Sequence, residues 1–187
     1  GFVEALRAGR SGVGPVTLFD AGACRSRAAA ELKAFNVADY LESQKAYLDR
    51  SSEVAYAAMS LALEDANLGP DDIRKDLTGL AVGSAYGSLK TMAVFLDDLV
   101  KKGPRFVKPF LFPHTFANTA ISLLAIDYGL KGLHLNFASG MVSSSQAILA
   151  GFDFIRQGRA TVFLAGGFDS LNVHLFQGLD ARGLLAP

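Results

Sequence analysis

The sequence has little of what several protein classes require. Its 187 residues include one cysteine and no tryptophan, which excludes a disulfide framework and a cysteine-rich metal site. Lys plus Arg and Asp plus Glu both number 18, so the formal net charge is zero. This balance argues against a broad surface for nucleic acid or anionic lipid. No apolar run approaches the roughly 18 residues of a membrane-spanning helix.

The composition is that of a globular protein. Half of the residues are hydrophobic and 19% are charged, close to the average of soluble domains. Charged residues interrupt the first apolar stretch, so no signal peptide is predicted, and we expect a soluble, cytoplasmic protein.

The two ends of the sequence resemble cuts through a longer protein. Residues 1–9 are typical of the last turns of a helix closed by glycine. Residues 183–187 end without a polar tail, so we expect residues 1–187 to be a fragment of a longer chain.

Short apolar strands alternate with helices along the chain. The pattern predicts helices at residues 26–35, 52–67, 89–102, 115–128 and 141–157, and strands at residues 77–84, 134–137 and 160–165. Ser51 or Ser52 is expected to cap the second of these helices. Residues 103–114 hold three of the six prolines and predict an irregular loop. The alternation is typical of a mostly parallel sheet covered on both faces, so the predicted fold class is α/β.

The most specific local pattern is a strand, a tight turn and a helix. The strand at residues 134–137 passes through Ala138, Ser139 and Gly140 to Met141, and a helix begins directly afterwards. Small residues suit a sharp bend against closely packed backbone. At the start of a helix, backbone N–H groups and the macrodipole stabilise a thiolate or an oxyanion. The tip suits a nucleophile, and this chain places Met141 there. The helix that follows is apolar over most of its circumference, which predicts that it is buried.

Short motifs recur in a defined order along the whole chain. In sequence they are Arg7-Ala8-Gly9-Arg10-Ser11-Gly12, Phe19-Asp20, Leu48-Asp49-Arg50, Val82-Gly83-Ser84 with Gly87, Phe112-Pro113-His114-Thr115 with Asn118, Tyr128-Gly129-Leu130-Lys131-Gly132, Ile155-Arg156-Gln157-Gly158-Arg159-Ala160 and Ala165-Gly166-Gly167. Their order and spacing resemble the β-ketoacyl synthase family, the condensing enzymes of fatty acid and polyketide synthesis. The resemblance implies the thiolase-like α-β-α-β-α fold, of which residues 1–187 would be the N-terminal half.

The chain departs from this family at the turn. Family members carry a cysteine there, which takes the acyl chain as a thioester. Counting back from Gly158 and forward from Gly132 places that position at Met141, whose thioether has no ionisable proton. Cys24 lies far upstream and does not match. The alternative is a shifted register, in which Ser139 or Ser143 would act, but a serine nucleophile needs a base and none is evident.

The resemblance implies further properties of the family. The two catalytic histidines of its members lie in the C-terminal half, and His114, His134 and His174 match neither. The reaction is a decarboxylative Claisen condensation of an acyl thioester with malonyl carried on acyl carrier protein, and it uses no metal or cofactor. The implied partners are acyl carrier protein, acyl and malonyl thioesters, and a second synthase subunit. Dimers form through the strand before the turn, here residues 133–137, where His134 is a candidate contact.

Together these observations predict a non-catalytic subunit, similar to the chain-length factors that pair with an active synthase. Two alternatives stay open. One is a divergent acyltransferase or thioesterase with its catalytic residues in the C-terminal half, and the other is a structural dimerisation module. The sequence therefore leaves both an enzymatic and a non-enzymatic role open.

Several other residues favour structural roles. We expect Asp169 to cap a loop, and the serines at 143–145 to act as caps and packing residues rather than as an anion site. Residues 83–87 lack both a GxGxxG pattern and a P-loop lysine, which indicates a structural turn. His114 is expected to be a loop residue with a satisfied hydrogen bond. Residues 107–116 resemble the region that lines the acyl tunnel or the subunit interface, or form a plain hydrophobic loop.

Overall fold

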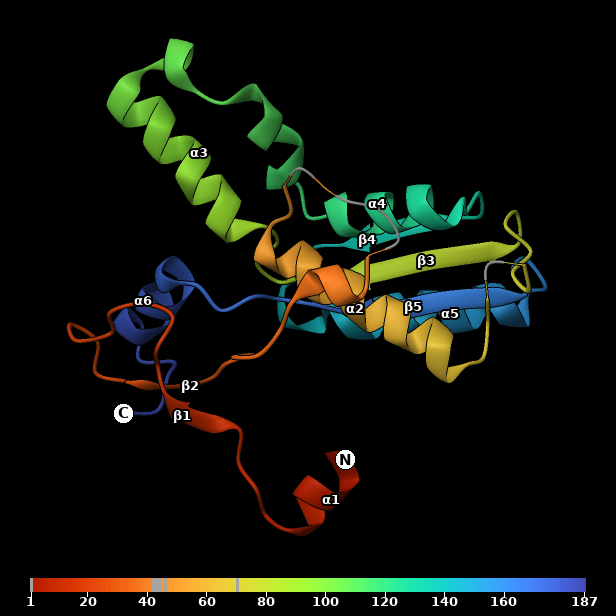
Figure 1. Cartoon of the computed structure of the whole chain (residues 1–187), viewed down its shortest axis with the longest axis horizontal. Coiled ribbons are helices and arrows are strands. Elements are labelled where there is room, and N and C mark those ends of the chain that lie inside the picture. Colours follow the sequence, from red (N-terminus) through yellow and green to blue (C-terminus); the bar gives the residue numbers. More distant parts are fainter. Residues whose placement is uncertain (1, 42–44, 46, 70) are drawn as a thin grey trace. The chain divides into compact units, whose positions relative to one another are not determined.

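The computed structural model describes residues 2–41, 45, 47–69 and 71–187 (Figure 1). The chain divides into two compact units. The larger unit is Asn36–Ser170, and the smaller unit combines Gly1–Phe35 with Leu171–Pro187. The larger unit contains a parallel sheet and the helices that pack on it, and the smaller unit contains a short hairpin and two helices.

The sheet of the larger unit confirms the predicted α/β class. Its strands are β3 (Thr78–Gly83), β4 (His134–Phe137) and β5 (Val162–Gly167), parallel and in the order β4-β3-β5. Gly83 pairs with Phe137 and with Gly167, so the three strands end at one edge. Helices α3 (Leu89–Lys102) and α4 (Thr119–Tyr128) lie between β3 and β4 in sequence, and α5 (Ser143–Arg156) lies between β4 and β5.

The two faces of the sheet are packed in different ways. On one face, β3 packs against α4 and α2 (Arg50–Asp65) in a hydrophobic core. Four of its side chains are at most 1% exposed: Leu80 and Val82 from β3, Leu124 from α4 and Tyr56 from α2. On the other face, α5 approaches through small residues. A Cβ on Gly151 would lie 2.9 Å from the ring of Phe163. Bulky side chains therefore fill one interface, and close backbone packing makes the other.

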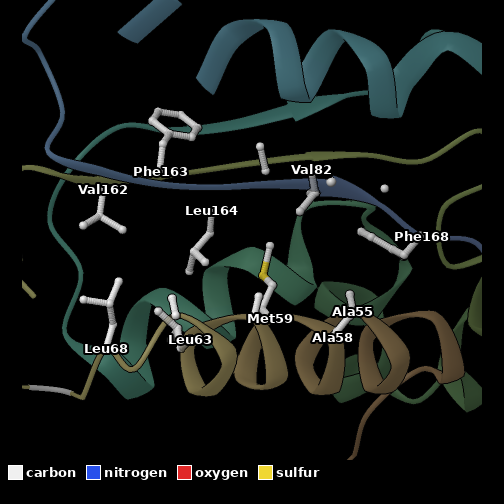
Figure 2. A pocket seen from close by; sticks show the side chains of 15 residues that line it. Ala55, Ala58, Met59, Leu63, Leu68, Val82, Val162, Phe163, Leu164 and Phe168 are labelled. Atoms are coloured by element: carbon white, nitrogen blue, oxygen red, sulfur yellow. The ribbon is translucent and has the colours of Figure 1, made fainter. Parts of the chain in front are cut away.

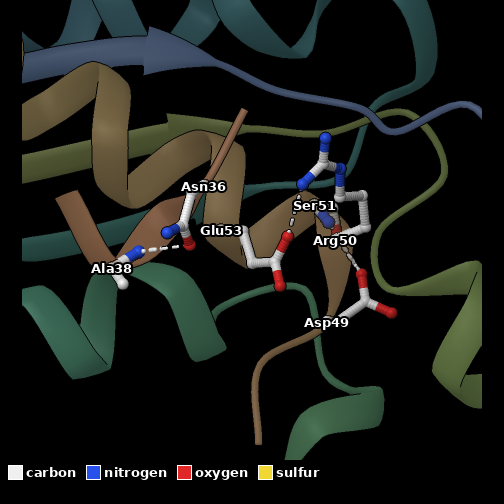
Figure 3. Close-up of polar contacts among 6 residues, drawn as sticks. All are labelled: Asn36, Ala38, Asp49, Arg50, Ser51 and Glu53. Carbon is white, nitrogen blue, oxygen red and sulfur yellow. Dashed lines mark hydrogen bonds and ion pairs between the residues drawn. The ribbon is translucent and has the colours of Figure 1, made fainter. Parts of the chain in front are cut away.

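Helix α2 begins at a different cap from the one predicted. Asp49 is extended (φ −70°, ψ 147°) and its carboxylate accepts a 2.9 Å hydrogen bond from the backbone N–H of Ser51 (Figure 3). Ser51 and Ser52 are already inside the first turn, so the prediction that one of them is the cap was wrong. In the same view an Arg50–Glu53 ion pair of 2.7 Å lies along that turn. Nearby, Asn36 caps the short 3-10 helix η1 (Val37–Asp39).

Two other segments differ from the prediction. Residues 26–35 do not form a helix, because Ala28–Ala30 (β2) pair antiparallel with Val13–Pro15 (β1). The Glu31 carboxylate accepts hydrogen bonds from Thr17, which reinforces this pairing and lowers the pKa of Glu31. Long-range pairing has overridden the helix propensity of three alanines. The expected irregular loop contains two 3-10 helices, η2 (Pro104–Phe106) and η3 (Pro109–Thr115).

The smaller unit is held together by a carboxylate on a helix that the sequence pattern did not predict. This helix, α6 (Val173–Ala181), carries Asp180, which accepts hydrogen bonds from the backbone N–H groups of Arg25 (3.0 Å) and Ser26 (2.9 Å). These bonds hold the pKa of Asp180 below its usual range. The opening helix α1 (Phe2–Arg7) confirms the helix tail that was expected there.

No single helix in the described part of the chain is long and apolar enough to cross a membrane. The segments Pro109–Thr115 and Thr119–Tyr128 reach the required length and composition only as a pair, and they are bent by 96° relative to one another.

Candidate functional site: the turn between β4 and α5

The predicted strand, turn and helix is present at the sheet edge where the three strands end. Strand β4 ends at Phe137, the 3-10 turn η4 spans Gly140–Val142, and α5 begins at Ser143. Gly140 has φ +68°, a backbone conformation that a side chain would strain. The bend therefore explains Gly140, but a Cβ built on it would meet nothing within 4 Å, so no closely packed backbone requires glycine there.

Met141 lies at the tip of the turn and is 76% exposed. It directly precedes Val142, the N-cap residue of α5, where unpaired backbone N–H groups give the helix end a partial positive charge. A cysteine or serine here would benefit from that charge, whereas a thioether carries no charge and has no proton to donate. The geometry of the turn suits a nucleophile, and the inactivity expected of Met141 at this position stays a prediction.

Ser143 has a structural role in this turn. Its side chain is 1% exposed, and its hydroxyl lies 2.6 Å from the carbonyl oxygen of Gly140 and 3.3 Å from that of Ser84. The hydroxyl oxygen also accepts a 2.9 Å hydrogen bond from the N–H of Ser139. None of these partners is a base. The structure therefore favours the capping and packing role predicted for Ser143, and it gives no support to a serine nucleophile at this position.

The turn after β3 is tied to Asp169, which follows β5. The Asp169 carboxylate accepts hydrogen bonds from the hydroxyl of Ser84 (2.8 Å) and from the N–H groups of Ala85 (3.1 Å) and Tyr86 (2.9 Å). The Ser84 hydroxyl in turn accepts from the N–H of Gly87 (2.7 Å). Both predictions, a structural turn at residues 83–87 and a loop-capping Asp169, are confirmed.

The predicted burial of α5 was wrong. Only its narrow face of Ser143, Ala147 and Gly151 is buried, whereas Leu149 and Phe152 are each 60% exposed. The reason is geometric, since one face of the helix contacts the sheet and no described element covers the opposite face. The exposed apolar side chains of this helix are Ile148, Leu149, Phe152 and Ile155.

A pocket of about 350 Å³ lies between α2 and β5 (Figure 2). In the figure, Ala55, Ala58 and Met59 of α2 point toward Val82 and Leu164 on the strands. The lining contains no titratable side chain. This pocket offers apolar contact and no acid, base or nucleophile, and Met141 is not among its lining residues.

The segment that resembles the tunnel or interface region is aromatic and partly exposed. Phe110, Phe112 and Phe116 are 56%, 52% and 48% exposed, and the rings of Phe112 and Phe116 meet edge to face at 5.2 Å. His114 packs against Tyr47 at 5.1 Å. Its Nδ1 atom is buried and finds no hydrogen-bond partner in the described part of the chain, so the predicted satisfied hydrogen bond is absent at that atom.

Two histidines should make folding sensitive to mild acid. Burial lowers the pKa of His114 below 6.5, although the negative charge of Asp49 partly opposes this, and burial also lowers the pKa of His134. As the pH falls through about 6.5, these histidines bind protons in the unfolded chain but stay neutral in the folded chain. The free energy of unfolding therefore decreases. We expect the urea midpoint to fall between pH 7.5 and 5.5, and to fall less in His114→Gln and least in His114→Gln/His134→Gln. An equal fall in all three proteins would contradict these pKa directions.

Strand β4 is an edge strand, as the predicted dimer contact requires. It pairs with β3 and with no other described strand. The buried Nε2 atom of His134 has no hydrogen-bond partner among the described residues. Pairing of this edge with a second subunit stays a prediction.

Comparison with known proteins identifies the family. The beta-ketoacyl synthase N-terminal domain family matches residues 1–187. The chloroplastic 3-oxoacyl-[acyl-carrier-protein] synthase I of Arabidopsis thaliana is 31% identical over 173 residues, which are 90% of this chain and 37% of that protein. The 3-oxoacyl-[acyl-carrier-protein] synthase 2 of a Synechocystis species is 32% identical over 168 residues, 89% of this chain and 40% of that protein. The chain therefore spans about two fifths of the length of these relatives.

Solved structures agree with the sequence comparison. The ishigamide ketosynthase/chain length factor superposes with a TM-score of 0.90 at 26% identity, over 100% of this chain and 47% of that chain. A beta-ketoacyl synthase from Burkholderia phymatum STM815 superposes with a TM-score of 0.81 at 28% identity, over 96% of this chain and 45% of that chain. The predicted thiolase-like fold is confirmed.

Proposed function

Because the chain belongs to the β-ketoacyl synthase family, we propose that it is part of a non-catalytic synthase-like subunit of fatty acid or polyketide synthesis. In this role it resembles a chain-length factor and pairs with an active synthase subunit. The observation that carries the proposal is Met141 at the exposed tip of the turn between β4 and α5.

The chemistry at this position separates the two kinds of subunit. In the family reaction a thiolate attacks the carbonyl carbon of an acyl thioester, the new thioester forms on the enzyme, and the carrier thiolate leaves. The sulfur of Met141 is already bonded to two carbons, so it cannot form a neutral thioester. Ser143 cannot take the place of a cysteine at position 141, because its hydroxyl is buried and hydrogen-bonded to backbone carbonyls.

The proposed partners are acyl carrier protein, acyl and malonyl thioesters, and a second synthase subunit. The names of the relatives include acyl carrier protein, and one structural neighbour is named for a ketosynthase/chain length factor. Two surfaces of this chain support such contacts. The β4 edge is available for strand pairing, and the exposed aromatic side chains of η3 suit an acyl chain or a subunit interface.

The direct test is to restore a thiol. With an acyl-carrier thioester, we expect the full polypeptide with Met141→Cys to gain a single acyl group, while the unchanged protein gains none. Intact-mass measurement under denaturing conditions detects the adduct. Val100→Cys is a matched control, since Val100 is 82% exposed and lies on α3, away from the turn. Acylation of Val100→Cys at the same rate would mean that any exposed thiol reacts.

The same measurement separates the alternatives. An acyl group on the unchanged protein would refute the non-catalytic role and favour the divergent acyltransferase or thioesterase. If neither the unchanged protein nor Met141→Cys is acylated, and no synthase subunit copurifies, the structural dimerisation module is favoured. Copurification with a synthase, with a changed product length when the pair is mixed, would support the chain-length role.

A further inference from the structure

We propose that Asp169, Ser84 and Ser143 are positioning residues that together fix the backbone of position 141. The inference rests on the proposed function in one respect only, namely that position 141 is the functional position of the turn. It concerns how the turn is held, whatever side chain stands at its tip.

The first part of the connection joins the ends of β5 and β3. Asp169 follows β5 by two residues, and its carboxylate accepts three hydrogen bonds of 2.8 to 3.1 Å from residues 84–86. One of these comes from the hydroxyl of Ser84, a residue that is 2% exposed. Hydrogen bonds to a carboxylate are about twice as strong as those between neutral groups. Asp169 therefore fixes the backbone directly after β3.

The second part joins this backbone to the turn. The carbonyl oxygen of Ser84 lies 3.3 Å from the hydroxyl of Ser143, and the N–H of Ser84 donates to the carbonyl of Phe137 at 3.0 Å. Ser143 also holds both sides of the turn, through the N–H of Ser139 and the carbonyl of Gly140. Position 141 lies inside this closed set of bonds, between Gly140 and Ser143.

The surrounding packing leaves the connection no room to relax. A Cβ on Gly83 would lie 2.1 Å from the carbonyl carbon of Ser143, and a Cβ on Gly167 would lie 2.1 Å from the hydroxyl of Ser144. The N–H of Phe168 donates to the carbonyl of Gly83 at 3.0 Å. Because the ends of β3 and β5 touch the start of α5, a change at Asp169 is transmitted to the turn rather than absorbed.

An exposed methionine does not itself require this arrangement, since Met is flexible and fits many environments. The hydrogen bonds act on backbone atoms and on the start of α5, so their effect is best measured through a group that senses that helix end. A thiol is such a group, because a helix N-terminus lowers its pKa below the ordinary value of about 8.5.

The test uses Met141→Cys and follows alkylation of the new thiol by iodoacetamide between pH 6 and 10. Peptide mapping separates this thiol from the buried Cys24. We expect a midpoint below that of a free cysteine. Adding Asp169→Ala or Ser143→Ala should raise the midpoint and slow alkylation at pH 7 about tenfold, since each pKa unit changes the thiolate fraction tenfold. Asp169→Asn keeps an acceptor for Ser84 and should have a smaller effect.

Two matched controls make the test specific. Ser145→Ala removes an exposed hydroxyl from the same helix turn, and Asp72→Ala removes a carboxylate that accepts a hydrogen bond from the N–H of Gly69 in another turn. Neither substitution should change the midpoint of alkylation.

An unchanged midpoint in Asp169→Ala, or an equal shift in the controls, would overturn the inference. Circular dichroism identifies any variant that fails to fold, and Asp169, which is itself exposed, is the position least prone to this. The readout needs no acyl transfer, so a failure of this inference can be distinguished from a failure of the proposed function.

Discussion

Gly83→Ala is expected to destabilise the chain by about 3 kcal/mol or more, at the upper end of what overpacking costs. The new Cβ would lie 2.1 Å from the carbonyl carbon and 2.3 Å from the carbonyl oxygen of Ser143, and 2.4 Å from the nitrogen of Ser144. These are backbone atoms at the start of α5, so no side-chain rotation relieves the contact. A urea unfolding curve gives the change in the free energy of unfolding.

Gly166→Ala is the matched control for this prediction. Gly166 lies on the neighbouring strand β5 and pairs with Val82, and a Cβ built on it meets nothing within 4 Å. We expect the unfolding free energy of this variant to stay within about 1 kcal/mol of the unchanged protein. If Gly83→Ala behaved in the same way, α5 would not pack on the sheet as closely as the structure shows.

The elements that sequence patterns predicted well are those whose information is local. Helix α3 spans Leu89–Lys102 as predicted, because its apolar residues recur at helical spacing up to a terminal glycine. Strand β4 was also placed correctly at His134–Phe137. By contrast, β2 exists through its antiparallel pairing with β1, in which Val13 lies opposite Ala30 and Pro15 lies opposite Ala28. Ala28–Ala30 alone contain no feature that favours a strand.

The candidate site was predictable as a turn but not as a set of contacts. Counting from flanking glycines placed Met141 at the tip, and the structure confirms the turn around it. Asp169 was expected to cap a loop, but its partner Ser84 lies 85 residues earlier, and no sequence spacing identifies such a pair. The exposure of Phe152 and Leu149 on α5 was also missed, since apolar composition predicts burial without saying what covers each face.

Asp49, the cap of α2 that the sequence analysis missed, also contacts a second helix. The residue is 1% exposed, and its carboxylate accepts hydrogen bonds from the N–H of Ser51 at 2.9 Å and from the N–H and hydroxyl of Thr91 at 3.1 and 2.6 Å. The Thr91 hydroxyl lies 2.7 Å from that of Tyr47. A single carboxylate therefore caps α2 and ties it to the first turn of α3, and acids before a helix are a recognisable cap pattern.

Asp49→Ala is consequently expected to lower the free energy of unfolding by about 3 kcal/mol. Loss of the cap costs about 1 kcal/mol, and leaving the buried N–H of Thr91 without an acceptor costs about 1–3 kcal/mol more. Asn36→Ala is the matched control, because Asn36 caps the short exposed helix η1 through one bond, and its loss should cost about 1 kcal/mol or less. Equal effects of the two substitutions would contradict the shared role of Asp49. A second readout depends on the charge of Asp49. Because this charge raises the pKa of His114 against the effect of burial, an NMR titration of Asp49→Ala should find a His114 pKa lower than in the unchanged protein.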